Sequence, residues 1–331
     1  MQISYQEIIS LENLFAAWQE FVVGKSKKTD VQEFALHLAG NILQLNEELA
    51  NFSYVHGGYE AFNISDPKPR NIHKASVRDR VLHHAIYRQL YPFFDKTFIA
   101  DSFSCRLNRG THKALNRFQA FGYRVGKNHT RTVWVLKCDI KKFFATIDHA
   151  KLIEILSVYI PDSGIMRLLK QVICSFVISE GKGLPLGNLT SQLFCNIYMN
   201  ELDQFVKHKL RVKHYIRYAD DFVFLSDNQI ELQRLVSKIS LFLQNRLRLF
   251  LHPDKVFIKT LASGVDFLGW VHFSRHRVLR SVSRRRMFKR VQKNPKNEVL
   301  QSYIGLLSHG NTFGVKADLL NSYYLLAEKL I

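Results

Sequence analysis

Two adjacent aspartates at the tip of a predicted hairpin constrain this chain more strongly than any other sequence feature. Residues 214–226 contain two apolar, β-prone runs on either side of Ala219-Asp220-Asp221, a pattern that predicts a tight β-hairpin. Residues 132–140 are rich in β-branched and aromatic residues and are predicted to form a half-buried strand with Asp139 near its end. An Asp-Asp pair by itself is usually only part of a turn. A sheet can, however, place a strand end beside a hairpin tip, so the three carboxylates can converge.

Carboxylates that lie close together are stabilised by a bound cation. Three unpaired carboxylates would repel one another and would lose solvation on burial. A divalent cation relieves both costs, and hard oxygen ligands suit Mg²⁺, which binds one or two protein carboxylates together with substrate phosphates. Two such ions about 4 Å apart can stabilise the attacking and leaving oxygens of an in-line phosphoryl transfer. We therefore expect a site for two Mg²⁺ ions.

The charge of the chain is strongly basic and unevenly distributed. Its 331 residues include 47 Lys and Arg against 28 Asp and Glu, a formal net charge of +19. Residues 1–66 carry 3 basic and 9 acidic side chains, so the basic excess lies in the rest of the chain. Folding does not require such an excess, and self-repulsion works against it. Binding of nucleic acid is the simplest explanation, although an anionic membrane surface or a generic basic character also fits.

Composition argues against several other classes of protein. The four cysteines are far apart and form no CxxC pair, which disfavours a disulfide framework and a zinc site. Residues 1–20 are predicted to form an amphipathic helix with acidic residues, not a signal peptide. No apolar run reaches the roughly 18–20 residues that a membrane span needs. We therefore expect a soluble, intracellular protein that has no membrane partner.

Hydrophobic spacing predicts a mainly helical chain with a few short strands. Residues 1–60 are expected to be helical, and short strands are expected at 256–258 and 267–272. From Ser274 the chain opens with a run of arginines and is then expected to be helical to Ile331, which would form a phosphate-binding surface or a solvated basic face. Further helices are predicted at residues 77–91, 148–160, 164–178, 190–210 and 230–247.

The aspartates lie within an ordered series of motifs that spans residues 66–310. In this order and spacing, the series resembles the reverse transcriptases. The YxDD box of that family corresponds to Tyr218-Ala219-Asp220-Asp221, and its first aspartate motif corresponds to Asp139-Ile140-Lys141-Lys142-Phe143-Phe144. The other matching segments are Pro67-Lys68-Pro69-Arg70, Asp79-Arg80-Val81-Leu82, Gly183 to Gln192, Leu251-His252-Pro253-Asp254-Lys255, Phe267-Leu268-Gly269-Trp270 and Gln301 to Asn311.

The resemblance implies an α+β fold, the right-hand polymerase. Residues 1–130 would form an N-terminal helical segment and the fingers. Residues 131–273 would form the palm, a small antiparallel sheet packed on helices that carries the catalytic aspartates. Residues 274–331 would form a short, helical and basic thumb. Fingers and thumb would enclose an RNA–DNA duplex that is held through its backbone.

The resemblance also implies a role for each matched residue of the catalytic motifs. Asp139 and Asp220 would be the main ligands of the two Mg²⁺ ions, and the backbone carbonyl of Ile140 would supply a further oxygen. Asp221 would assist or bind one ion. Phe144 would lie against the sugar 2′ position of the incoming nucleotide and exclude a 2′-hydroxyl. Taken without the motif, Phe144 is more simply a core aromatic residue.

Two further groups of residues would bind nucleotide and template. The triphosphate of the incoming deoxynucleotide would be held by arginines, because their forked geometry matches phosphate. Candidates for this role are Arg70, Arg78 and Arg80, with Lys68 and Lys74 as further choices. The template and the incoming base would be positioned by Leu186, Gly187, Ser191 and Gln192.

The template motif indicates which branch of the family is closest. Intron-encoded members typically have QGxxxSP, whereas this chain has Leu186-Gly187-Asn188-Leu189-Thr190-Ser191-Gln192. That xGxxxSQ pattern resembles the reverse transcriptases of diversity-generating retroelements, which are encoded by bacteria and phages. Such an enzyme copies a template-repeat RNA into cDNA with errors at adenines, and the cDNA diversifies a target gene by mutagenic retrohoming. A small, basic, helical, oligomeric accessory protein would be its partner in the cytoplasm.

Three other interpretations remain open at this stage. The chain could be another bacterial reverse transcriptase, either intron-like, defence-associated or CRISPR-associated. It could be a catalytically silent RNA-binding protein with a polymerase fold, although the intact aspartates argue against this. A metal-dependent nuclease would also use clustered aspartates, but it would not account for Phe144 or for the Leu251–Lys255 motif.

Overall fold

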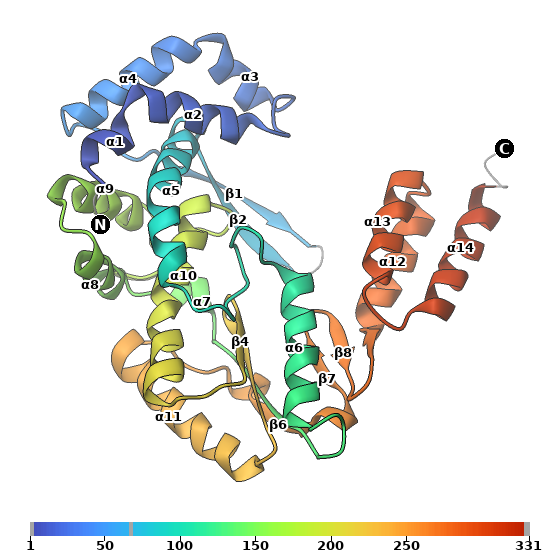
Figure 1. The fold of residues 1–331 in the computed structure, drawn as a ribbon. Coiled ribbons are helices and arrows are strands. Elements are labelled where there is room, and N and C mark those ends of the chain that lie inside the picture. The colour runs from blue at the N-terminus through green and yellow to red at the C-terminus, as the bar shows by residue number, and fades with distance from the viewer. Residues whose placement is uncertain (1–2, 66–68, 328–331) are drawn as a thin grey trace. The chain divides into compact units, whose positions relative to one another are not determined.

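The computed structural model describes residues 3–65 and 69–327, which belong to two compact units (Figure 1). The first unit comprises the chain up to Arg106, Ile140–Val212 and Ile239–Pro253. The second comprises Leu107–Asp139, Lys213–Lys238 and the chain from Asp254 onward. Each unit is therefore assembled from three separate segments. In the part of the chain described here, no helix has both the length and the apolar character of a membrane span.

The first unit begins with helices that pack around the long helix α5. Serine is the N-cap residue of three of them. The side chains of Ser4, Ser10 and Ser76 accept hydrogen bonds from backbone amides in the first turns of α1, α2 and α5. Helix α2 buries Leu14 and Phe21, and it packs against α5. The bounds are α1 Tyr5–Ile9, α2 Leu11–Val22, α3 Thr29–Leu36, α4 Leu38–Ala50 and α5 Val77–Thr97.

A two-stranded antiparallel hairpin precedes α5. Strands β1 (Tyr59–Ile64) and β2 (Arg70–Ala75) pair from Tyr59 opposite Ala75 to Ile64 opposite Arg70. Most of their side chains are at least partly exposed, so the backbone ladder and the contacts at the base of the hairpin hold it in place.

The second helical part of the first unit surrounds α10. Twelve residues of α10 are buried, and α10 packs against α5 and α8. Asp148 and Asp162 cap α8 and α9 through their carboxylates. The elements are α7 Phe143–Thr146, α8 His149–Tyr159, α9 Ser163–Cys174, α10 Leu189–Gln204 and the π-helix Phe205–Lys209.

A four-stranded antiparallel sheet forms the centre of the second unit. Its strand order is β4-β5-β3-β6, with bounds β3 Trp134–Asp139, β4 Tyr215–Tyr218, β5 Asp221–Ser226 and β6 Phe257–Thr260. Helix α6 (Thr111–Val125) packs against β4 and β5. Gly122 of α6 lies close to the 3₁₀ turn Leu261–Ser263, where an added Cβ atom would lie 2.8 Å from the Leu261 side chain. Helix α11 (Gln229–Leu247) begins in the second unit and ends in the first.

The second unit continues into a small sheet and three C-terminal helices. Strands β7 (Val265–Phe267), β8 (Trp270–His272) and β9 (Arg277–Leu279) are antiparallel neighbours. The helices are α12 Ser281–Lys293, α13 Asn297–Leu307 and α14 Phe313–Ala327. Short 3₁₀ turns occur at Pro253–Lys255 and Leu261–Ser263.

The loop between α13 and α14 is fastened to the small sheet. Arg277 is 8% exposed; its Nε donates to the carbonyl of His309, and its Nη2 donates to Asn116 Oδ1 over 2.9 Å. Gly310 lies against Trp270 so closely that a Cβ atom would be 2.1 Å from the indole ring. Any larger residue at position 310 would therefore displace the loop or the ring.

Most predicted elements occur in the structure. The sequence does not predict helices α6 and α7, and residues 51–58 are not helical as expected. Three further differences concern strands. The hairpin β1–β2 was not predicted. The predicted strand 267–272 is two strands, because Leu268 (φ 51°) and Gly269 (φ 84°) form a left-handed turn between them. Strand β9 lies within the stretch after Ser274 that was expected to be basic and then helical. The division into fingers, palm and thumb at residues 130 and 273 remains a prediction.

Candidate active site

The strand register of the central sheet sets the three predicted catalytic aspartates at one edge of it. Asp139 at the end of β3 lies directly opposite Asp221 at the start of β5. Tyr218 pairs with the same Asp221 on the other side, so Ala219 and Asp220 form a two-residue hairpin turn. Ala219 has φ 56°, a left-handed conformation that costs energy for a residue with a Cβ atom. All three carboxylates thus belong to one rigid edge of the second unit.

Arg217 supports this turn from inside the protein. Its side chain is fully buried, and its Nη1 donates to the carbonyl oxygen of Ala219 over 3.1 Å. The hydrogen bond stabilises the left-handed residue beside Asp220. The sequence placed Arg217 next to the YxDD box, but its role as a buried support required the structure.

Two lysines lie beside the aspartates. Lys137 precedes Asp139 by two residues and therefore lies on the same face of β3. Its Nζ is 3.4 Å from Asp221 Oδ2 and donates to the backbone carbonyl of Asp266 over 2.9 Å. Lys255 Nζ donates to Asp139 Oδ1 over 3.0 Å. Lys137 is mostly buried, whereas Lys255 is about half exposed.

Lys137 does not fully offset the burial of the Asp221 carboxyl group and the repulsion from its acidic neighbours. Burial raises the pKa of Asp221 to about 6; Lys137 acts in the opposite direction, and Asp139 and Asp220 add to the increase. Its Oδ1 atom is buried and has no hydrogen-bond donor within the described structure. A buried carboxylate oxygen without a donor, beside two more carboxylates, fits a divalent cation.

The aspartates alone do not form a closed ligand set. Among residues 3–65 and 69–327, no three His, Cys, Asp or Glu side chains are gathered closely enough to hold a metal ion. Oxygens of the substrate would have to complete the coordination, which is usual for ions that bind one or two protein carboxylates together with phosphates.

Replacing Lys137 with Met is expected to destabilise the protein in a pH-dependent manner. The change removes the donor that Asp221 and the Asp266 carbonyl share, which should lower the free energy of unfolding by about 1–3 kcal/mol at pH 8, where Asp221 is ionised. At pH 5 most of the Asp221 carboxyl is protonated, so the loss should be smaller. Urea denaturation measures both values. Lys259→Met, an exposed lysine of β6, is the control; equal losses in both variants at pH 8 would contradict the assignment.

Ile140 and Phe144 lie in the first unit, just after Asp139. Ile140 is buried and forms a β-bridge with Leu251. Phe144 belongs to the short helix α7, is half-buried, and packs edge-on against Phe143 with ring centroids 5.6 Å apart. The backbone carbonyl of Ile140 as a metal ligand and Phe144 as the residue that selects the sugar both remain predictions.

The motif predicted to position the template is hydrogen-bonded to strand β2. The carbonyl of Leu186 accepts from the amide of His73 over 3.1 Å, and Asn188 Nδ2 donates to the carbonyl of His73 over 2.8 Å. Gly187 has φ 103°, and a Cβ atom there would lie 2.9 Å from Ile72. The requirement for glycine in this motif thus has a local steric cause.

The remaining template residues lie at the start of α10. Ser191 is buried and Gln192 is half-buried, while Leu186 is half-buried in the preceding loop. The contacts of Asn188 and His73 could not be predicted, because neither residue differs from an ordinary loop or strand residue in the sequence.

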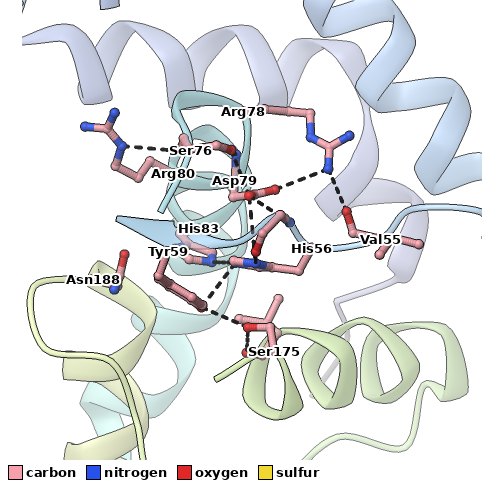
Figure 2. Close-up of polar contacts among 12 residues, drawn as sticks. Val55, His56, Tyr59, Ser76, Arg78, Asp79, Arg80, His83, Ser175 and Asn188 are labelled. Carbon is pink, nitrogen blue, oxygen red and sulfur yellow. Dashed lines mark hydrogen bonds and ion pairs between the residues drawn. The ribbon is translucent and has the colours of Figure 1, made fainter. Parts of the chain in front are cut away.

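The predicted phosphate-binding arginines differ in their surroundings (Figure 2). Arg78 donates to Glu48 over 2.8 Å and to the carbonyl of Val55 over 2.6 Å. Arg80 forms an ion pair with Asp30, which Lys74 also contacts. Arg70 is exposed at the start of β2. Lys68 lies outside the described residues.

Arg78 and Arg80 therefore help to hold α5 against α4 and α3. Triphosphate binding by these two residues stays a prediction that would require them to exchange partners, whereas Arg70 is exposed. Arginines at these two positions are therefore explained equally well by a structural role in ion pairs and by a role in binding phosphate.

Asp79, in the second fingers motif, is the centre of a buried network (Figure 2). It is fully buried and accepts hydrogen bonds from Tyr54, Ser76 and the amide of Gly57. Burial alone would raise the pKa of Asp79, but His56 and the hydrogen bonds from Ser76 and Tyr54 bring it below its ordinary value. The ionised group fastens α5 to the loop before β1.

Similarity to known proteins agrees with this site. Residues 65–272 match the family described as reverse transcriptase (RNA-dependent DNA polymerase). The match covers more than half of the chain and includes β3, the β4–β5 hairpin and the template motif. The chain therefore belongs to the reverse transcriptase family.

Two relatives illustrate how the chain compares in length. It is 26% identical over 258 residues to Protein YkfC of Escherichia coli strain K12, covering 66% of each protein. It is 23% identical over 271 residues to the group II intron-encoded protein LtrA of Lactococcus lactis subsp. cremoris, covering 61% of this chain and 44% of LtrA. The chain thus spans about two thirds of YkfC and less than half of LtrA.

Solved structures with a similar fold are telomerases. One is telomerase from Candida albicans with a fragment of telomeric RNA, with a TM-score of 0.53, 11% identity, and coverage of 84% of this chain and 58% of that one. Another is apo telomerase from Candida tropicalis, with a TM-score of 0.50, 15% identity, and coverage of 73% and 60%. This likeness confirms the predicted α+β polymerase fold.

Proposed function

We propose that this chain is an RNA-directed DNA polymerase in which Asp139, Asp220 and Asp221 bind two catalytic Mg²⁺ ions. The observation that carries the proposal is the β3–β5 register, which sets Asp139 opposite Asp221 with Asp220 in the adjoining turn. When bound, the ions would stabilise charge on the attacking and leaving oxygens of nucleotidyl transfer. Membership of the reverse transcriptase family supports this chemistry.

The protein's own residues would prepare the site for that chemistry. Arg217 holds the turn that presents Asp220, and Lys137 holds Asp221 through one carboxylate oxygen. A site whose groups are already oriented does not have to reorganise as charge develops. Phe144 would exclude ribonucleotides, and Arg70 would bind the triphosphate.

Basic residues of the C-terminal helices would contact the RNA–DNA duplex. Arg284, Arg285 and Lys289 line a hollow of about 770 Å³ together with Phe288, and Arg284 forms an ion pair with Asp318. Lysines and arginines in such a place bind phosphates without reading sequence. The enzyme would use template RNA and deoxynucleotides as substrates. It would act in the cytoplasm of a bacterium, where both are present.

Within the family, we place the chain in the branch of diversity-generating retroelements. The support is the template motif, which has Leu186 and Gln192 where intron-encoded members have Gln and Pro. The cDNA would then be mutagenic at template adenines and would diversify a target gene. The similarity to LtrA favours, as a second candidate, an enzyme of the group II intron type that copies accurately.

Sequencing of the cDNA separates these two candidates. The protein is incubated with a structured RNA template, deoxynucleotides and Mg²⁺, with and without a co-expressed accessory protein. Errors concentrated at template adenines would support the retroelement branch. Accurate cDNA would instead place the enzyme with the intron-type members.

Leu186→Gln is expected to reduce errors at template adenines by about tenfold, because restoring the usual amide should tighten the hold on the templating base and raise the cost of a mispair. The error spectrum of the cDNA measures this. Leu241→Gln, an exposed leucine on α11, is the control and should leave the spectrum unchanged. An unaltered adenine error rate in Leu186→Gln would remove position 186 from the explanation.

The acidic N-terminal helices would dock the basic accessory protein. Glu48 is engaged with Arg78, so the test uses two exposed acids, Glu33 and Glu47. Changing both to Lys is expected to weaken binding of the accessory protein by at least about tenfold, measured by calorimetry at low salt. Arg234→Glu with Lys238→Glu on α11 serves as a charge-reversal control. Unchanged affinity of the Glu33/Glu47 variant would mean that this segment only completes the fingers.

A further inference from the structure

Helix α6 has two faces of opposite character. One face is apolar and packs on the sheets of the second unit; Phe118 contacts Phe267 and His272, and Phe121 contacts His214. The surrounding segment, residues 107–131, contains 6 Lys and Arg, 2 His and no Asp or Glu. The outer face of α6 therefore carries positive charge and no acidic residue.

The outer basic residues follow the axis of α6. Lys113, Arg117 and Arg124 are spaced by four and seven residues, so they lie along one side of the helix. At about 1.5 Å per residue, the first and last are about 16 Å apart along the axis. Arg117 lies over the ring of Phe121 at 4.5 Å, and Lys113 donates to the carbonyl of Asn108. Lys127 follows two residues after the helix end and is exposed.

A hollow lies beside the second half of this row. Its volume is about 540 Å³, and it is lined by Asn116, Gln119, Ala120, Tyr123, Arg124 and His129. Tyr123 is 47% exposed, so a ligand can reach part of this residue. Arg131, just beyond the lining residues in the chain, forms an ion pair with Asp227. The hollow thus combines an exposed aromatic ring with an arginine and has no acidic lining.

An unusual turn forms the end of the hollow. Lys127, Asn128 and His129 have φ values of 43°, 59° and 69°, three successive non-glycine residues in the left-handed region. Such a run costs energy and persists only where the surroundings enforce it. The amide of Asn128 donates to the carbonyl of Tyr123, and the turn brings the His129 ring edge-on to Tyr123, with centroids 5.3 Å apart.

We propose that this surface, formed by Lys113, Arg117, Tyr123, Arg124, Lys127 and His129, binds single-stranded nucleic acid. One unpaired base stacks on the exposed side of Tyr123, and the flanking phosphates contact Arg124 and Lys127. Aromatic rings beside a positively charged row are the features by which proteins bind single strands without reading sequence. A stacked base must be unpaired, which distinguishes this surface from one for duplex. The site does not involve the catalytic carboxylates.

The test measures binding of short fluorescein-labelled oligoadenylate RNA and of its DNA counterpart to the full chain. Anisotropy is recorded with EDTA and without deoxynucleotides, so catalysis plays no part. Tyr123→Ala is expected to weaken binding by about tenfold, whereas Tyr123→Phe, which keeps the ring, should retain most of the affinity. Arg124→Ala with Lys127→Ala should reduce the slope of log affinity against log salt by about 1.4.

Arg234→Ala with Lys238→Ala, two exposed basic residues of α11, is the charge-matched control. Its affinity and salt slope should equal those of the wild type. Loss of RNA binding in the Tyr123 and Arg124 variants assigns the site to the template, loss of DNA binding assigns it to the product, and loss of both supports single strands in general. If all folded variants bind both oligonucleotides like the control, the proposal is wrong, and Arg124 and Lys127 only complement the dipole at the C-terminal end of α6.

Discussion

Asp220→Asn is expected to lower the rate of DNA synthesis on an RNA template by at least about a thousandfold, or about 4 kcal/mol of barrier. The amide has nearly the same shape as the carboxylate but lacks the charge that binds a divalent ion. Asp220 lies in the turn between β4 and β5, where Ala219 and the hydrogen bond from Arg217 already fix the backbone. The substitution should therefore leave the fold intact. Primer extension under single-turnover conditions measures the rate.

Asp227→Asn is the matched control for this experiment. Asp227 follows the same strand β5, is about half exposed, and forms an ion pair with Arg131. Its loss should change the rate by less than about threefold, since exposed ion pairs contribute little. Circular dichroism of both variants confirms folding. Equal, small effects in the two variants would mean that Asp220 is not a catalytic ligand.

Phe144→Ala is expected to reduce the preference for deoxynucleotides over ribonucleotides by about a hundredfold. In the proposed function the ring occupies the space that a 2′-hydroxyl would need, and alanine leaves that space open. The relevant measurement is the ratio of kcat/KM for dATP and ATP on one primed RNA template. The rate with dATP itself should fall much less than the ratio.

Phe250→Ala controls for the loss of an aromatic ring, because Phe250 is 56% exposed and its carbonyl accepts from the amide of Lys141 near the same motif. That variant should keep the wild-type ratio. If Phe144→Ala also keeps it, the ring is a packing residue of α7, the simpler interpretation of an aromatic residue at this place.

The sheet edge that carries Asp139, Asp220 and Asp221 could be predicted from sequence because its signals are local. Alternation in 132–140 and the two apolar runs around Asp220 predict strands and a hairpin, and a hairpin fixes its own register. The pairing of Asp139 with Asp221 follows once β3 and β5 are neighbours. The lysines could not be assigned in this way, since the contact of Lys137 with Asp266 joins strands far apart in the chain.

The hairpin β1–β2 and the start of α5 contain structure that hydrophobic periodicity does not predict. Strands β1 and β2 expose most of their side chains, so they lack the alternation by which strands are recognised. The network around Asp79 draws polar residues from the loop before β1 and from α5, and polar residues carry no periodicity. For the same reason Arg78 and Arg80 were assigned to phosphate binding without their ion pairs being foreseen.

The turn at Leu268 illustrates a third limit. A leucine with φ 51° is an unlikely choice for a turn on propensity alone, and the apolar run 267–272 accordingly predicts one strand. Tertiary contacts override that preference, because Phe267 and Trp270 are both buried on the small sheet. Such conflicts between local preference and packing are resolved only by the folded structure.

The most direct test of the central claim is DNA synthesis by the purified wild-type chain on a primed RNA template. The assay contains deoxynucleotides and Mg²⁺, and parallel reactions contain EDTA or the Asp220→Asn, Asp221→Asn double variant. We expect template-directed DNA product with Mg²⁺, and none with EDTA or with the variant. RNA binding without product under every condition, by a folded wild-type chain, would contradict the account and would favour a silent RNA-binding protein with a polymerase fold.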